Sequence, residues 1–305
     1  GYSLFKCVVM ESKYLYLNVP SLLQLDGSDL LIEERQLPYG RQRVPLKSLG
    51  MLCVHHQEVA VPFGVMDALE EHRVLVLRMD GRMRCFDPYY YDMQLSRARE
   101  LQMQLKFSLS LRLRLWRQVM QEMLHNQYAV LQVMELLTPE IQVYYEERIG
   151  QTNFGNYHRC LEQYDRLLDL SPIRSVPETK GLLQLGRTLL KLMICAFLNK
   201  SGVDSSLGWF GDADAARTLS LTDTLALSLM PLMDFLILQS FQVSDYISLG
   251  PESYPTVLME VLPTEIPTKN GTLPLKELVA RQAEGLLDCY LGMEKTLPPT
   301  LFCAV

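Results

Sequence analysis

The chain has 305 residues, of which 48% are hydrophobic, and a formal net charge of −6 at pH 7. It can bury a large core, and at roughly 150 residues per domain its length suggests two domains. The negative net charge gives no overall attraction to nucleic acid, so any DNA contact would need local basic surfaces. The seven cysteines are scattered without CxxC spacing, which is typical of a reducing compartment, and we expect a cytoplasmic protein.

Short apolar runs with polar or glycine-containing breaks predict strands in the first third of the chain, at residues 4–9, 14–17, 22–25 and 30–33. This spacing favours antiparallel meanders. Residues 62–72 have helical periodicity, and residues 74–78 return to a strand pattern before Asp80-Gly81, a hairpin signal. We therefore expect a small N-terminal β-domain over residues 1–88.

Longer periodic segments predict helices in the remainder of the chain, at residues 95–137, 157–170, 179–199, 221–239 and 275–291. Leucines at alternate positions over residues 109–115 would alone support a strand. Flanks rich in Gln, Met, Leu and Arg without glycine or proline favour a helix there instead. The fold class predicted is α+β, with a larger all-α domain over residues 89–305.

Residues 219–241 are apolar and long enough to span a bilayer. Asp223 and Asp234 lie inside this stretch together with Pro231, which favours a buried core helix. The first ten residues lack the basic and apolar regions of a secretory signal. We expect no membrane partner.

Three motifs of the helical part follow one another in a fixed order. His125-Asn126-Gln127 comes first. Residues 181–190 read Gly-Leu-Leu-Gln-Leu-Gly-Arg-Thr-Leu-Leu, and residues 202–210 read Gly-Val-Asp-Ser-Ser-Leu-Gly-Trp-Phe. The N-terminal part contributes the runs at residues 14–17, 44–46 and 74–77 with the Asp80-Gly81 pair.

In this order the chain resembles the CRISPR-associated Cas1 integrases, the larger subunit of the spacer-acquisition machinery. That family has a basic residue before Asn-Gln, and then a helix Asn-Ala-Leu-Leu-Ser-x-Gly-Tyr-x-Leu-Leu, with Lys180 here at the Asn position. A Gly-Leu-Asp-Pro-x-Leu-Gly-Phe-x segment then delivers a metal-binding His. The resemblance implies a homodimer through the β-domain.

The chemistry of the family needs a Glu, a His and an Asp around a divalent cation that activates water or a DNA 3′-hydroxyl. By resemblance these positions hold Asn156, Gly211 and Thr224. Such a site lacks anionic charge and would hold Mg²⁺ poorly. The resemblance therefore implies a non-catalytic relative with no metal and no cofactor.

A displaced carboxylate cluster is the alternative, and its members would be Glu162, His158, Asp212, Asp214 and Asp223. In that case the protein would be an active endonuclease or integrase that uses Mg²⁺ or Mn²⁺. His158 lies at the start of a predicted helix, which favours a surface or capping role.

Several cations could contact DNA phosphates without reading sequence: Arg82, Arg84, Arg97, Arg99, Lys106, Arg112, Arg114 and Arg117. A solvated face without a ligand remains open, since Arg112 and Arg114 are two apart and cannot share one helical face. We expect a non-catalytic subunit that binds double-stranded DNA, such as a prespacer or CRISPR repeat, and partners such as Cas2 or an active Cas1. A protein-interaction scaffold without DNA binding is the other alternative.

Overall fold

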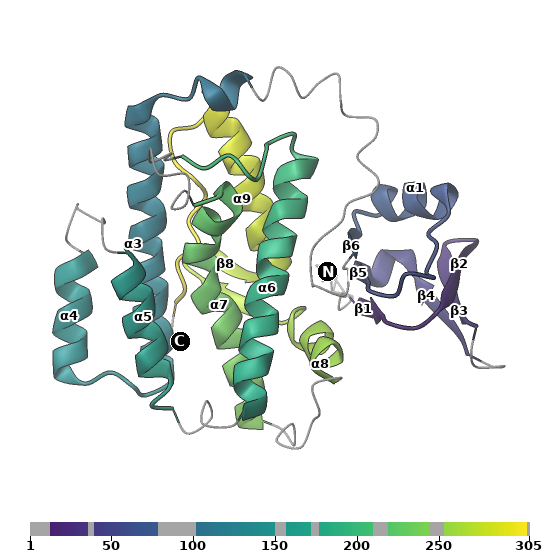
Figure 1. Ribbon diagram of the computed structural model, residues 1–305, viewed down its shortest axis with the longest axis horizontal. Coiled ribbons are helices and arrows are strands. Elements are labelled where there is room, and N and C mark those ends of the chain that lie inside the picture. Colours follow the sequence, from purple (N-terminus) through teal and green to yellow (C-terminus); the bar gives the residue numbers. More distant parts are fainter. Residues whose placement is uncertain are drawn as a thin grey trace, which may run out of the picture. The chain divides into compact units, whose positions relative to one another are not determined.

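The computed structural model describes residues 13–35, 40–78, 102–149, 157–171, 177–209, 219–243 and 253–303. The chain divides into two compact units, Gly1–Asp87 and Pro88–Val305 (Figure 1). The described part of the first unit is built mainly from strands, and helices dominate the second. The predicted α+β class is confirmed.

The first unit contains an antiparallel sheet in the order β2-β3-β4. Its strands are β2 (Ser21–Asp26), β3 (Asp29–Glu34) and β4 (Arg41–Pro45). Gly27, with a φ of 63°, allows the tight turn between β2 and β3, where the sequence has Asp26-Gly27. The antiparallel prediction is confirmed for this sheet.

The second sheet of this unit is parallel, in the order β1-β5-β6, so the antiparallel prediction is wrong for it. It consists of β1 (Lys13–Leu17), β5 (Leu49–Val54) and β6 (Leu75–Arg78). Helix α1 (Phe63–Glu71) connects β5 to β6 and returns the chain in the same direction. The central strand β5 is buried along its whole length, as parallel strands usually are.

The second unit is a helical bundle whose described helices are α3 (Leu109–Val133), α4 (Pro139–Ile149), α5 (Tyr157–Leu168), α6 (Pro177–Lys200), α7 (Leu221–Val243), α8 (Tyr254–Val261) and α9 (Leu275–Tyr290). The four helices predicted from residue 157 onward are confirmed as α5, α6, α7 and α9. The helix predicted over residues 95–137 is interrupted and ends earlier. Residues 102–105 are helical, and α3 begins after the N-cap Ser108, whose side chain accepts the Leu111 N–H. Residues 95–101 lie outside the described part of the chain. Helices α4 and α8 were not predicted.

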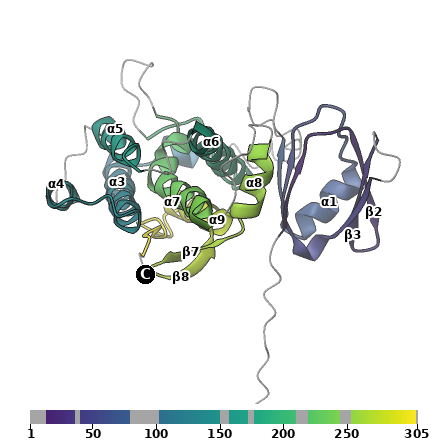
Figure 2. The same ribbon diagram turned by 90° about the horizontal axis from the view of Figure 1, so that it is seen from below.

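Helix α7 forms the centre of the bundle. It lies between α3 and α6, and Figure 2 shows these helices nearly end-on. The segments Thr179–Lys200 and Leu221–Ser240 are long and apolar enough to cross a membrane, yet 50% and 83% of their respective windows are buried inside the protein. Gly186 permits close packing of α6 on α7, because a Cβ there would lie 2.5 Å from Ile237 Cδ1.

The helical unit also holds a two-stranded hairpin, β7 (Glu265–Thr268) and β8 (Gly271–Pro274). The sequence analysis expects an all-α domain over residues 89–305, so the hairpin is a departure from that prediction. The C-terminal segment joins the hairpin, since Phe302 forms an antiparallel bridge with Thr268. The hairpin and this segment together form a small sheet edge beside the bundle.

Candidate functional site

Ser220 caps the N-terminus of α7 and fixes the first acidic side chain of that helix. The Asp223 N–H donates to Ser220 Oγ over 3.0 Å, and Ser220 Oγ donates to Asp223 Oδ2 over 2.7 Å. Thr224 is 2% exposed, and its hydroxyl donates to the Ser220 carbonyl over 2.9 Å. Both side chains therefore take part in the start of the helix, as in other N-terminal capping arrangements.

Lys191 on α6 neutralises the Asp223 carboxylate. Its Nζ lies 2.8 Å from Asp223 Oδ1. Partial burial opposes ionisation of Asp223, but the Lys191 ammonium and the Ser220 hydroxyl outweigh it and hold the pKa of the carboxyl below its usual value. A metal ion at this carboxylate would have to displace an ammonium group that is already bound.

The two candidate ligands on α5 lie at the protein surface. His158 and Glu162 are both exposed, one helical turn apart. The His158 ring lies against the Tyr157 ring, with 3.8 Å between their centroids. Within the described ranges of the chain, no group of three or more His, Cys, Asp or Glu side chains is arranged to hold a metal ion. Asn156, Gly211, Asp212 and Asp214 lie outside the described residues.

A buried ion cluster joins three helices of the bundle. Arg187 on α6 donates from Nε and Nη2 to the two Asp234 oxygens on α7, over 2.8 and 2.6 Å. Its Nη2 also donates to Asp165 Oδ1 on α5 over 2.8 Å. Asp234 is fully buried. A buried bidentate pair of this kind fixes the three helices relative to one another.

Sequence reasoning missed this cluster, although it noted Asp234 as a charge inside an apolar stretch. The available signal was a second charge, Arg187, in another apolar helix. A charge inside an apolar helix of a globular protein needs a partner, so the two could have been paired.

The basic residues at the start of α3 divide into two classes. Arg112 donates from Nη1 to the Trp209 carbonyl over 3.3 Å and from Nη2 to the Leu105 carbonyl over 3.2 Å, so its guanidinium ties chain segments together. Lys106, Arg114 and Arg117 are exposed. Arg82, Arg84, Arg97 and Arg99 lie outside the described part of the chain.

Arg114 and Arg117 line one cavity of about 600 Å³. The other lining residues are Ser110, Gln118, Gln121, Thr296, Leu297 and Pro299. No acidic residue lines this cavity, and neither arginine forms an ion pair with a residue that the structure describes. The spacing of three residues places both guanidinium groups on one helical face, unlike Arg112 and Arg114. Among the residues that the structure describes, no acidic group neutralises the positive charge of this cavity.

The C-terminal segment forms one wall of this cavity because α3 holds it through three polar side chains. Gln118 exchanges two hydrogen bonds with the Leu297 backbone, over 2.7 and 2.9 Å. Glu122 accepts from both the N–H and the hydroxyl of Thr300, and Asn126 accepts the Phe302 N–H. The spacing of four residues along α3 brings the three side chains onto one face.

No protein-family model and no curated protein matches the chain. Solved structures do match. The Cas1 protein from Thermotoga maritima aligns with a TM-score of 0.58 at 15% identity, over 94% of this chain and 99% of that one. A casposase bound to its integration product aligns with a TM-score of 0.59 at 14% identity, over 94% of this chain and 93% of that one.

The chain has a Cas1-like fold. A Cas6-RT-Cas1–Cas2 complex provides a third match with a TM-score of 0.56 at 15% identity, over 95% of this chain and 36% of that chain. The family resemblance predicted from the motifs is thereby confirmed at the level of the fold. The motif helix of residues 181–190 lies within α6, and Thr224 lies in the first turn of α7.

The described residues do not fit the divalent cation that Cas1 chemistry uses. Thr224 offers a neutral hydroxyl that is already bonded to its own helix, and the neighbouring Asp223 is bound by Lys191 and Ser220. A hard cation requires several anionic oxygens at once. The assignment of Asn156, Gly211 and Thr224 to the ligand positions stays a prediction.

Proposed function

We propose that this protein is a non-catalytic Cas1-type subunit that holds DNA. The observation that carries the proposal is the ion pair between Lys191 and Asp223. In this pair the lysine ammonium neutralises the carboxylate beside Thr224. With a lysine ammonium in contact with this carboxylate, Mg²⁺ would gain little from it. The Cas1-like fold supports a role in CRISPR adaptation in the cytoplasm.

DNA holding requires positive charge that is not compensated by neighbouring acids. The cavity lined by Arg114 and Arg117 meets this requirement. Contacts from such side chains go to phosphates, so binding should be largely independent of sequence. The casposase that shares the fold is bound to its integration product, which supports DNA as the ligand class.

The partners of the protein are part of the proposal. One matching structure is a complex of a Cas1-containing chain with Cas2, so Cas2 or an active Cas1 is the expected partner class here. A homodimer through the N-terminal unit is expected as well. The three-stranded sheets of that unit have edge strands, such as β4, whose backbone groups can pair with a second copy.

The test of DNA holding is a salt titration with a fluorescein-labelled branched duplex. Binding should lose orders of magnitude in affinity between about 50 and 200 mM salt, because condensed counterions are released. The variant Arg114→Gln/Arg117→Gln removes two possible phosphate contacts. The slope of log affinity against log salt concentration should therefore become shallower by nearly two, since each contact contributes about 0.9. The matched control Lys269→Gln/Arg281→Gln removes two exposed charges that do not line this cavity, and it should keep the wild-type slope.

Absence of DNA binding by the wild-type protein at low salt would contradict the proposal. It would favour the alternative of an interaction scaffold without a DNA ligand.

A further inference from the structure

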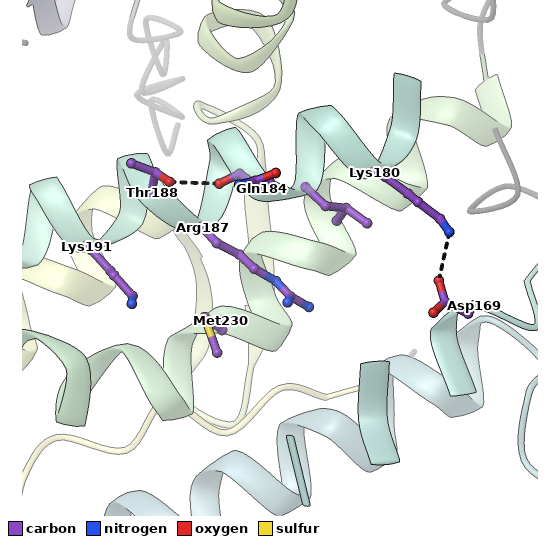
Figure 3. A pocket seen from close by; sticks show the side chains of 8 residues that line it. Asp169, Lys180, Gln184, Arg187, Thr188, Lys191 and Met230 are labelled. Atoms are coloured by element: carbon purple, nitrogen blue, oxygen red, sulfur yellow. Dashed lines mark hydrogen bonds and ion pairs between the residues drawn. The ribbon is translucent and has the colours of Figure 1, made fainter. Parts of the chain in front are cut away.

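Two cavities of the helical unit are lined by cations. The cavity along α6 has a volume of about 610 Å³ (Figure 3), and each of its cations is paired with a carboxylate. The pairs are Lys180 with Asp169, Arg187 with Asp165 and Asp234, and Lys191 with Asp223. The cavity lined by Arg114 and Arg117, here called the arginine cavity, has no acidic residue in its lining. The proposed phosphate contact therefore depends on the arginine cavity and on the residues that shape it.

The C-terminal segment, residues 296–303, forms one wall of the arginine cavity and is held along both of its edges. On one edge, the N–H groups of residues 297, 300 and 302 donate to side chains of α3 over 2.9, 3.1 and 2.9 Å. On the other edge, the backbone of residues 301 and 303 bonds with that of residues 269 and 267, at the β7–β8 hairpin, over 3.0 and 3.1 Å. These bonds fix the position of the wall relative to α3.

Gly285 on α9 gives the C-terminal segment room to lie where it does. A Cβ at this position would lie 2.7 Å from Pro298 Cγ and nearer still to Pro298 Cδ. Both atoms belong to a rigid ring, so the clash could be relieved only by a shift of the segment or of α9. Leu297 and Pro299, the neighbours of Pro298, line the arginine cavity. A side chain at residue 285 would therefore disturb the wall without changing any charge in the lining.

The wall adds two features that charge alone does not supply. Thr296 lines the cavity, and its hydroxyl group can donate to a phosphate oxygen. Leu297 and Pro299 add apolar surface, and an ion pair is stronger where apolar atoms replace water. The wall is also joined to the cationic face of α3, because Gln118, the residue after Arg117, exchanges two hydrogen bonds with the Leu297 backbone.

We propose that the C-terminal segment is a positioning element for the DNA contact, and that Gly285 is the positioning residue that lets it dock. A phosphate in the arginine cavity contacts both α3 and the wall, so DNA binds the protein more tightly when the segment is docked. Such a coupling is reciprocal: docking raises the DNA affinity, and DNA stabilises docking by the same factor. The inference rests on the proposed DNA-holding function.

Gly285→Ala tests this coupling, with the affinity for the labelled branched duplex measured by anisotropy. Alanine is a better helix former than glycine, so the strain falls on the packing against Pro298 and not on α9 itself. The affinity at about 100 mM salt should fall about tenfold, the effect of losing one hydrogen bond to a charged group. The slope of log affinity against log salt concentration should remain that of wild type, because both arginines are kept. Circular dichroism checks that the variant is folded.

Two further variants isolate the contact with Pro298. Pro298→Ala removes the ring atoms Cγ and Cδ, so Gly285→Ala/Pro298→Ala should regain most of the wild-type affinity. Gly64→Ala in α1 is the matched control, because a Cβ there has no neighbour within 4 Å. The affinity of this control should stay within about twofold of wild type.

Hydrogen exchange of the wild-type protein is a second measurement, and it does not depend on the folding of Gly285→Ala. Saturating DNA should slow the exchange of the N–H groups of residues 297, 300 and 302 by about tenfold, the factor that reciprocity requires. The Arg114→Gln/Arg117→Gln protein, saturated with the same DNA, should show no such slowing.

Wild-type affinity in Gly285→Ala would overturn the inference and leave the proposed function standing. So would unchanged exchange of the C-terminal segment when the wild-type protein is saturated with DNA. An affinity lost in Gly285→Ala that Pro298→Ala does not restore would show that Gly285 does not act through the segment. If wild type binds no DNA, the proposed function itself fails, and the inference fails with it.

Discussion

Lys191 Nζ on α6 lies 2.8 Å from Asp223 Oδ1 on α7, in the helical turn that also contains Thr224. The Asp223 carboxylate is thus already paired with a cation of the protein itself, and it attracts a metal ion from solution less strongly. The pair also links the two central helices at the end of α7 where a Cas1-type metal site is expected by resemblance.

The Lys191–Asp223 pair should contribute modestly to stability, because the side chains are 46% and 37% exposed. A double-mutant cycle with Lys191→Met and Asp223→Asn, measured by urea unfolding, should give a coupling of about 0.5 to 1 kcal/mol. The lowered pKa of Asp223 sets the pH dependence. The coupling should be present above the unfolded pKa of about 4 and disappear as the pH falls through the lowered value. A coupling that does not decline as the pH falls would argue against an ion pair.

The Arg187–Asp234 contact should matter far more, since Asp234 is completely buried. Asp234→Ala leaves a buried guanidinium short of its partner and should lower the free energy of unfolding by about 3 to 5 kcal/mol. Arg187→Met/Asp234→Leu removes both charges and should recover most of that loss. Denaturant unfolding of the three proteins provides the check, and a double variant less stable than Asp234→Ala would refute the ion-cluster interpretation.

Close packing of α6 on α7 should depend on Gly186. Gly186→Ala places a Cβ 2.5 Å from Ile237 Cδ1, and the strain should cost about 1 to 3 kcal/mol. Adding Ile237→Val removes the clashing methyl group and should restore part of the loss. Gly64→Ala is the matched control, because a Cβ there has no neighbour within 4 Å and the change should be neutral or slightly stabilising. Thermal unfolding distinguishes the three, and equal effects of Gly186→Ala and Gly64→Ala would contradict the packing.

The contribution of Glu122 to stability should decline as the pH rises. Burial raises the pKa of Glu122, although its hydrogen bonds with Thr300 and Gln118 act in the opposite direction. A raised folded-state pKa means that the stability contribution is complete below the unfolded value of about 4.3 and declines as the pH rises through the folded value. The stability advantage of wild type over Glu122→Gln should therefore be larger at pH 4 than at pH 8. An advantage that grows with pH would reverse this interpretation.

The helices of the bundle could be predicted from the sequence where the pattern is local. Helix α6 and helix α7 have long apolar periodicity, and their predicted bounds agree closely with the structure. The pairing of β1 with β5 could not be predicted, because parallel pairing joins segments that are far apart and leaves no local signature. The same reason applies to the C-terminal segment. The Thr300 hydroxyl donates to Glu122 on α3, which lies 178 residues earlier in the chain.

The candidate site was predictable in part. The sequence names Arg114 and Arg117 as candidate DNA contacts, and the structure shows that both are exposed. The structural role of Arg112 could not be predicted, because the Leu105 and Trp209 carbonyls that it binds are brought near only by the fold.

Metal-dependent chemistry on DNA is the most direct test of the non-catalytic proposal. Purified wild-type protein is incubated with branched and prespacer-like DNA in Mg²⁺ or Mn²⁺, and cleavage and strand transfer are followed on denaturing gels. We expect neither product above the level of a metal-free control, and no gain from Lys191→Met, because Asp223 alone supplies too few anionic oxygens for a hard cation. Metal-dependent products from the wild-type protein that Asp223→Ala or Glu162→Ala abolishes would contradict the proposal and identify an active Cas1-type enzyme.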